Sequence, residues 1–290
     1  MPRVQVGDVA IEYVEAGSGV PLVWCHELAG AMESWLPQVQ FFARRYRVIA
    51  FNARGYPPSD VPEDPTAYSQ ELAVADLHGL LRALGIAEAY VGGLSMGGAT
   101  ALQFGLRHPA MARGLVVAGA GTGSTDPERF RRQCEEFARS IETAGMEAMR
   151  EYTAGPTRVQ LRRKDPLGWR RFADDFLAHS AVGTALTLRG VQGGRPPIFE
   201  YESALRALAV PTLIVVGDED EPCLEPALFL KRTIPRAGLA VLPQSGHTLN
   251  LEEPDLFNRA VLDFLTAVES GAWAEREEGS GAGFLAGPAT

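Results

Sequence analysis

Short apolar runs and segments of helical spacing alternate over the first 123 residues of the chain. The apolar runs are rich in β-branched residues, whereas the segments between them repeat apolar residues every three or four positions. Leu77, Leu81 and Leu84, for example, fall on one stripe of a helix. Strands are predicted at 4–6, 11–14, 22–24, 48–51, 89–92 and 116–118, and helices at 35–44, 69–84 and 96–107. This alternation predicts an α/β fold with a mostly parallel sheet and helices on both faces.

The alternation stops at Gly119, where a turn-rich stretch begins. The segment 124–205 contains no clear strand, so we predict a helical cap there, inserted into a core made of residues 1–123 and 206–290. We expect the tail 271–290 to be loosely held, because it is rich in glycine and lacks periodicity. Beyond the cap, strands are predicted at 212–216 and 239–242, and helices at 226–233 and 255–268.

Composition and charge exclude some classes of binding partner. The chain has 27 Lys and Arg residues against 36 Asp and Glu residues, a net charge of −9, and no dense basic run interleaved with aromatic residues. It is therefore unsuited to neutralising a phosphate backbone, and we expect no nucleic acid partner. No apolar run approaches the ~18 residues that span a bilayer, so we expect no membrane partner.

The cysteines indicate neither a disulfide framework nor a zinc site. Cys25, Cys134 and Cys223 are odd in number, lie far apart in the sequence and form no Cys-x-x-Cys pair. The N-terminus lacks the apolar stretch of a signal peptide. We expect a cytoplasmic protein with no metal and no organic cofactor.

The stretch Gly93-Leu94-Ser95-Met96-Gly97 joins a predicted strand to a predicted helix. A sharp turn of this kind strains its central residue and requires very small residues two positions away on either side. Gly93 and Gly97 meet that requirement, so this nucleophile elbow would lift the Ser95 hydroxyl above the sheet. The first N–H groups of the helix would face any negative charge formed beside it. The pattern predicts Ser95 as a nucleophile and the Met96 N–H as an oxyanion donor, with a small-residue packing face as the alternative.

A serine nucleophile needs a histidine base and a carboxylate that orients the base. Of the five histidines, His247 lies in a late loop between the last predicted strand and the last predicted helix. His78 and His108 fit helix surfaces and helix ends better. The loop 218–221, after the preceding strand, offers four acidic residues, and spacing alone leaves open which of them orients the base.

The order of serine, acidic loop and histidine resembles that of the α/β-hydrolase family. The resemblance covers almost the whole chain and implies an eight-stranded, mostly parallel sheet with an inserted helical cap. Residues 245–254 are similar to the family's Gly-His…Glu-x-Pro segment, and residues 217–220 are similar to its acidic loop. The resemblance implies a Ser-Asp-His triad in which Asp220 is the acid that orients His247, with Asp218 as the alternative.

The resemblance also implies a second oxyanion donor in the loop after the third strand, which reads Cys25-His26-Glu27-Leu28. By position this donor is the Leu28 N–H. Glu27 stands where the family usually has glycine, and a carboxylate facing a developing oxyanion would oppose catalysis. We therefore expect Glu27 to point away and to form hydrogen bonds within its own loop.

The predicted cap carries a group of basic residues. Solvated helix surface is the expected role for them. The alternative is that one or two of them face an anionic group of the substrate. The group consists of Arg158, Arg162, Arg163, Lys164, Arg170 and Arg171.

The type of nucleophile sorts the reactions that the resemblance implies. Epoxide hydrolases and haloalkane dehalogenases of this family use aspartate, whereas esterases, lactonases, thioesterases and carbon–carbon bond hydrolases use serine. The chain is similar to small bacterial carboxylesterases and enol-lactonases, so we predict cleavage of a small carboxylic ester or lactone through an acyl-enzyme. The alternatives are a carbon–carbon bond hydrolase of the meta-cleavage type and a ligand-binding relative without turnover. Dimers are common among the resembling enzymes, so a homodimer stays open.

Overall fold

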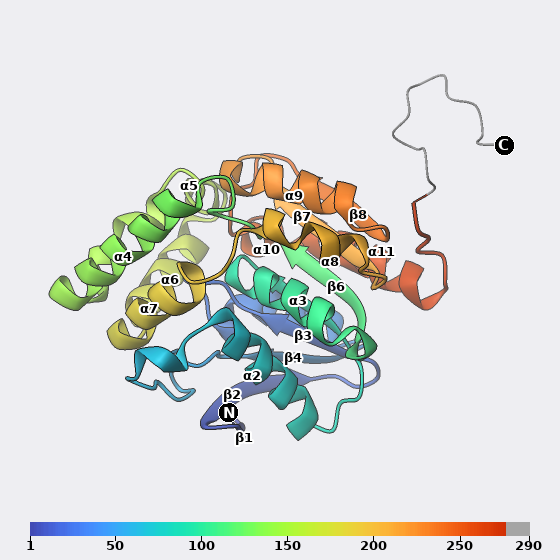
Figure 1. Cartoon of the computed structure of the whole chain (residues 1–290), viewed down its shortest axis with the longest axis horizontal. Helices are drawn as coiled ribbons and strands as arrows, with labels where there is room; N and C mark the ends of the chain where they lie inside the picture. The colour runs from blue at the N-terminus through green and yellow to red at the C-terminus, as the bar shows by residue number, and fades with distance from the viewer. Residues whose placement is uncertain (277–290) are drawn as a thin grey trace.

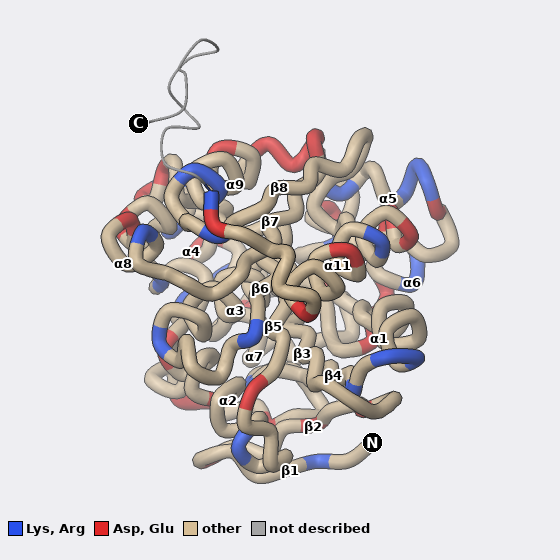
Figure 2. Tube along the Cα trace, turned by 90° about the vertical axis from the view of Figure 1, so that its right-hand side faces the viewer, with Lys and Arg blue, Asp and Glu red and all other residues tan. Residues whose placement is uncertain are grey.

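Eight strands form one sheet in the computed structural model, which describes residues 1–276. Their order is β1-β2-β4-β3-β5-β6-β7-β8, and Figure 2 shows them stacked from bottom to top. The β1–β2 and β2–β4 pairs are antiparallel, and the other pairs are parallel. The predicted eight-stranded, mostly parallel sheet is confirmed. The strands span Arg3–Val6 (β1), Val9–Ala16 (β2), Pro21–Cys25 (β3), Arg47–Phe51 (β4), Ala89–Leu94 (β5), Ala112–Ala118 (β6), Thr212–Gly217 (β7) and Ala237–Leu242 (β8).

Helices cover both faces of the sheet (Figure 1). In β3, Leu22 and Trp24 pack in one core with α1 and α11, whereas Val23 and Cys25 pack in the other with α2, α3 and α9. A parallel strand buried on both sides must be apolar along its whole length, which explains the apolar runs in the sequence. The helices are Leu36–Phe42 (α1), Gln70–Ala83 (α2), Met96–Arg107 (α3), Glu221–Thr233 (α9), Leu249–Glu252 (α10) and Pro254–Glu269 (α11).

The chain between β6 and β7 forms helices and no strand, and the predicted cap lies within it. Figure 1 shows α4 to α7 gathered at one end of the molecule. They share a hydrophobic cluster of their own, which also includes Leu28 and Ala29 from the loop after β3. The cap therefore packs directly on that loop. Its helices are Pro127–Ala144 (α4), Val159–Lys164 (α5), Pro166–Leu177 (α6) and Ala181–Thr187 (α7). The last helix before β7, Glu202–Arg206 (α8), packs against α9 and buries Leu205 in the core.

Two helix boundaries differ from the prediction. The helix predicted at 226–233 begins at Glu221, because Pro222 occupies its first turn, where a missing N–H costs nothing. Pro226 lies inside this helix. The helix predicted at 35–44 is shorter, since a 3₁₀ turn at Met32–Trp35 precedes α1. Within residues 1–276, no helix is long and apolar enough to cross a membrane.

The expectation of a loose tail is wrong for residues 271–276. The Trp273 ring lies edge-on to Phe264, with 4.8 Å between the ring centroids, and its indole N–H donates to the Arg236 carbonyl at 2.8 Å. The Arg276 N–H donates to the Pro235 carbonyl at 3.1 Å. An aromatic anchor therefore holds this segment against the core. Residues 277–290, the rest of the predicted tail, lie outside the described residues.

Candidate active site

Four loops meet at the carboxyl edge of the sheet. Parallel pairing connects β3, β5, β7 and β8, so the loops that follow these strands begin at the same edge. The loops carry Leu28, Ser95, Asp220 and His247, and all four residues line one cavity. The structure thus brings together the three predicted catalytic residues and the predicted oxyanion loop.

Ser95 occupies the sharp turn between β5 and α3. Its φ of 55° and ψ of −111° are a strained combination for a residue with a side chain. A Cβ on Gly97 would lie 2.0 Å from the Cys25 carbonyl oxygen, and a Cβ on Gly93 would lie 2.2 Å from the Gly97 carbonyl oxygen. Backbone contacts therefore exclude side chains at both positions, which is the requirement inferred from the sequence.

His247 and Asp220 form a buried pair at the ends of β8 and β7. The His247 Nδ1 lies 2.8 Å from the Asp220 Oδ2, and the two side chains are 7% and 1% exposed. Burial alone would lower the pKa of His247, but the Asp220 carboxylate raises it above the usual value of 6.5. Because Nδ1 is bound to Asp220, Nε2 is the ring nitrogen available to Ser95.

Asp218, the alternative acid, faces a different group. Its Oδ1 accepts a hydrogen bond from the Ser245 N–H at 3.1 Å, so it braces the turn before the histidine. The structure therefore places Asp220, rather than Asp218, at the imidazole.

Two further contacts hold the backbone around His247. The Glu252 carboxylate accepts hydrogen bonds from the N–H groups of Gly246 at 2.6 Å and Thr248 at 3.0 Å, on either side of the histidine. The His247 N–H itself donates to the Thr157 carbonyl at 2.7 Å. Thr157 belongs to the cap, so the cap contributes directly to the position of the histidine.

Asp220, Cys223 and His247 form the one group in residues 1–276 that brings three potential metal ligands together. These atoms already have partners: the Cys223 thiol donates to the Gly119 carbonyl at 3.2 Å, and the imidazole is bound to Asp220. Burial also raises the pKa of Cys223 well above 9, which opposes the thiolate that a metal would need. The three side chains therefore fit a hydrogen-bonded cluster better than a metal centre.

The predicted oxyanion donors come from the start of α3 and from the loop after β3. Met96 is the first residue of α3, and the first N–H groups of a helix have no acceptor within the helix. Leu28 lies in the β3 loop, where the Tyr56 hydroxyl donates to its carbonyl oxygen at 3.0 Å. This bond fixes the Leu28 residue beside the elbow.

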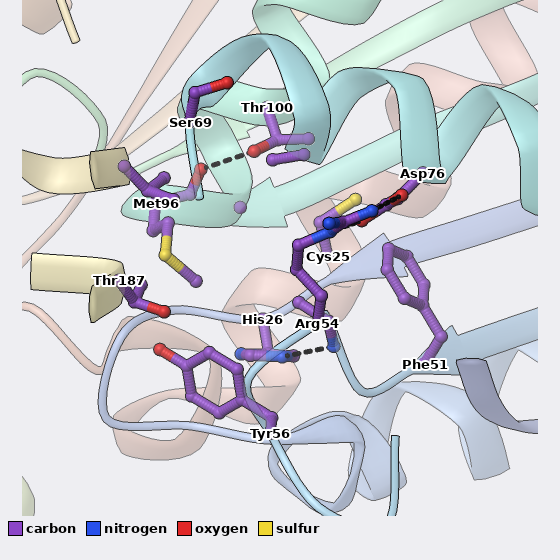
Figure 3. Close-up of a pocket in the computed structure, with 14 residues that line it drawn as sticks. Cys25, His26, Phe51, Arg54, Tyr56, Ser69, Asp76, Met96, Thr100 and Thr187 are labelled. Carbon is purple, nitrogen blue, oxygen red and sulfur yellow. Dashed lines mark hydrogen bonds and ion pairs between the residues drawn. The ribbon is translucent and has the colours of Figure 1, made fainter. Parts of the chain in front are cut away.

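His26 braces the same loop from behind. Its Nε2 accepts a hydrogen bond from the Ala53 N–H at 3.0 Å, so the proton must sit on Nδ1, which lies 2.7 Å from the Glu27 carbonyl oxygen. Burial lowers the pKa of His26 to about 4. Figure 3 shows His26 next to Tyr56, beside a cavity of about 30 Å³ that Met96 also lines. His26 therefore acts as a neutral structural support for the loop.

Glu27 points away from the cavity, as expected, but its main partner lies in the cap and not in its own loop. Both of its carboxylate oxygens accept hydrogen bonds from the Arg158 guanidinium. Both side chains are 2% exposed. Arg158 is therefore an internal ion-pair partner, and the expectation that it is solvated surface is wrong because Glu27 requires a buried cation. The other arginines of the basic group, Arg162, Arg163, Arg170 and Arg171, are exposed as predicted.

The cavity above Ser95 has a volume of about 190 Å³. The cap supplies most of its wall, and apart from Asp220 and His247 its lining carries no acidic or basic side chain. The space therefore fits a small, largely apolar group attached to a carbonyl carbon. The lining consists of Leu28, Ser95, Thr122, Phe130, Gln133, Cys134, Phe137, Tyr152, Thr157, Leu188, Gln192, Asp220, Pro222 and His247.

Comparison with known proteins assigns the family. The model of the alpha/beta hydrolase fold matches residues 20–254. The chain belongs to the α/β-hydrolase family. The resemblance to this family is confirmed, and so is the prediction that the protein is a hydrolase.

The relatives of this α/β-hydrolase carry different substrate names. A 2-hydroxymuconate semialdehyde hydrolase of Pseudomonas sp. (strain CF600) is 30% identical over 282 residues, covering 89% of this chain and 91% of the relative. A 3-oxoadipate enol-lactonase of Acinetobacter baylyi is 26% identical, covering 88% and 92%. The structure of a thermophilic esterase from Thermogutta terrifontis matches with a TM-score of 0.84 and 26% identity, covering 92% of this chain and 99% of the esterase.

The close contacts of the elbow predict that a methyl group added at Gly97 destabilises the protein strongly. Gly97→Ala should lower the free energy of unfolding by at least about 3 kcal/mol, because its Cβ would overlap the Cys25 carbonyl. Gly155→Ala is the matched control: its φ is −64° and its nearest neighbour would lie 3.4 Å from the new Cβ. That variant should change the free energy by less than about 1 kcal/mol. Urea unfolding measures both, and equal stability of the two variants would contradict the argument.

Because His26 is buried and neutral, we expect the protein to lose stability in mild acid. Between about pH 6.5 and about pH 4 the unfolded His26 binds a proton that the folded one does not, so stability falls as the pH falls. His26→Gln, whose amide can accept from Ala53 and donate to Glu27, should weaken this dependence. Burial also lowers the pKa of His179 to about 3, so this second histidine should keep part of the pH dependence in the variant. Urea midpoints measured from about pH 7.5 to pH 4.5 test this, and an unchanged slope in the variant would refute it.

Proposed function

We propose that this protein is a serine hydrolase that cleaves a small carboxylic ester or lactone through an acyl-enzyme. The observation that carries the proposal is the meeting of Ser95, on its strained turn, with the buried His247–Asp220 pair in one cavity. A triad is recognised by this geometry and by the roles that it allows.

In the proposed mechanism His247 accepts the proton of the Ser95 hydroxyl through Nε2 while the oxygen attacks the substrate carbonyl. Asp220 stabilises the imidazolium that forms. The N–H groups of Met96 and Leu28 hold the oxyanion of the tetrahedral intermediate. His247 then protonates the leaving alcohol, and in the second half it activates the water that hydrolyses the acyl-enzyme.

The lining of the cavity supports an ester or lactone with an uncharged, compact acyl part. It has apolar side chains such as Phe130, Phe137 and Leu188, and no arginine or lysine that could pair with a substrate carboxylate. A carbon–carbon bond hydrolase is the second candidate, because relatives at about 30% identity carry that kind of name. The same nucleophile could serve that reaction, so substrate tests must separate the two.

We also propose a cellular compartment and a partner for this protein. The three cysteines are free and buried, which supports a reducing compartment such as the cytoplasm. A small molecule is the proposed partner.

Substitution of the triad tests the mechanism. Ser95→Ala should lower kcat on a p-nitrophenyl ester by on the order of 10⁶, and Asp220→Asn by roughly 10⁴, because the imidazole would lose its orienting carboxylate. Asp218→Asn is the control acid and should keep kcat within about tenfold, since Asp218 only braces a turn. Circular dichroism confirms folding of each variant. If Asp218→Asn were the more damaging of the two, the assignment of the acid would be wrong.

A substrate series tests the bond that is cleaved. With p-nitrophenyl esters from acetate to decanoate, we expect multiple turnovers and an optimum at short acyl chains, because the cavity holds only about 190 Å³. Rapid cleavage of a vinylogous 1,5-diketone, with slow turnover of every ester, would favour the carbon–carbon hydrolase. Binding without turnover, unchanged in Ser95→Ala, would point to a ligand-binding protein.

A further inference from the structure

The buried ion pair Glu27–Arg158, at the edge of the site, costs free energy of desolvation. Both side chains are 2% exposed, and taking two charges out of water costs more than a well-packed apolar pair would. Neither residue lines the cavity above Ser95. The pair therefore needs an explanation other than substrate contact or general stability.

Aromatic groups and one hydroxyl complete the surroundings of Arg158. Its guanidinium donates to the Tyr152 hydroxyl at 2.9 Å, and its central carbon lies 4.5 Å from the centroid of the Tyr152 ring and 5.6 Å from that of Phe172. Burial alone would raise the pKa of Glu27, but the charge and the hydrogen bonds of Arg158 hold it below its usual value. Glu27 is therefore a carboxylate at neutral pH, locked onto one cap residue.

Two adjacent cap residues hold two different catalytic loops. The Thr157 carbonyl accepts the His247 N–H at 2.7 Å, and the next residue, Arg158, binds the Glu27 side chain. Glu27 immediately precedes Leu28, the proposed oxyanion donor. Thr157 and Arg158 thus connect the histidine loop to the oxyanion loop, although neither belongs to the core.

The charges around His247 come from several elements. Asp220, on the β7 loop, binds Nδ1 directly, and Glu27 and Arg158 act on the ring at longer range with opposite signs. Tyr152 and Cys223 also lie near this site, and burial raises the pKa of each, which keeps them neutral. The ion pair therefore adds almost no net charge next to the base while both partners are present.

We propose that Arg158 and Glu27 are a pair of positioning residues, supplied by the cap and by the oxyanion loop, that fix Leu28 and His247 relative to each other without adding net charge beside the base. The proposal rests on the proposed function, because it assigns the pair to the same triad and oxyanion hole. It makes the cap a part of the catalytic machinery.

The proposal predicts different effects of the two single variants. Arg158→Met removes the cation that keeps the buried Glu27 ionised, so Glu27 should take up a proton and the pKa of His247 should stay close to its wild-type value. Glu27→Gln keeps nearly the same shape and leaves an uncompensated cation, so the pKa of His247 should fall. This fall should be about half a pH unit or more, which is less than the 1–3 units that a directly adjacent charge causes. The double variant Glu27→Gln/Arg158→Met should return the pKa to within about 0.3 of the wild-type value, because it again adds no net charge.

NMR titration of histidine-labelled protein measures this pKa without requiring turnover, with the His247 signal assigned by its loss in His247→Ala. The matched control is the double variant Arg54→Met/Asp76→Asn, which removes another buried pair: the Arg54 Nε lies 2.6 Å from an Asp76 oxygen, and Figure 3 shows the two side chains together. This control should leave the pKa of His247 unchanged. In parallel, the acid limb of kcat/KM against pH on the best ester should move with the NMR value in each variant.

The outcomes separate the proposal from a purely structural role. A fall in Glu27→Gln that Arg158→Met and the double variant do not show, together with a kcat lowered by about tenfold or more in the double variant, supports it. No fall in Glu27→Gln, an equal fall in the double variant, or an unchanged kcat in the double variant would overturn it. If Arg158→Met does not fold, Glu27→Gln alone decides, since a fall supports the proposal and an unchanged value refutes it. If no ester is hydrolysed but the pKa of His247 falls in Glu27→Gln and recovers in the double variant, the proposed function fails while the coupling of the pair to His247 stands.

Discussion

The close packing of the first turn of α3 on the end of β3 is the constraint on which the site depends. Gly97 approaches the Cys25 carbonyl so closely that no side chain fits between them. This contact brings the start of α3 beside the loop that carries Leu28, and it forces the turn in which Ser95 has a φ of 55°. Packing between a helix and a strand thus offsets the strain in one residue, and the proposed nucleophile and both proposed oxyanion donors take their positions from that single approach.

The rest of the machinery follows from the order of the strands. Because β5, β6, β7 and β8 are parallel neighbours, the loops after β7 and β8 open on the same edge as the elbow. Asp220 and His247 can then meet within 2.8 Å although 27 positions separate them in the chain. Glu252 and Thr157 hold the histidine loop from two sides, so the base is fixed by its backbone as well as by its acid.

The sequence predicts the parts of this arrangement that have local causes. The strands are buried on both faces and therefore apolar, and the glycines at 93 and 97 are required by contacts within a few residues of the turn or with the adjacent strand. The boundary of α9 is harder to predict, because Pro222 and Pro226 both suit the first turn of a helix, and the observed helix begins at the earlier one and continues through the later one. The contacts of Trp273 could not be predicted, because the segment around it has the glycine-rich composition of a loose terminus. A single tryptophan hardly changes that composition.

The pairing of Glu27 with Arg158 could not be predicted in the same way, because 131 positions and a domain insertion separate the two residues. The sequence predicted hydrogen bonds of Glu27 within its own loop, and it predicted solvated surface or substrate contact for the basic residues of the cap, so no pattern connected Glu27 to Arg158.

This pairing also limits how freely the protein can be recombined. Caps of this fold are inserted between two strands and look like exchangeable modules, yet here a transplanted cap without an arginine in the place of Arg158 would leave Glu27 buried without its cation. A chimera would need Glu27 changed along with the cap. The boundary that matters for engineering therefore runs through the ion pair and not through the two points where the cap joins the core.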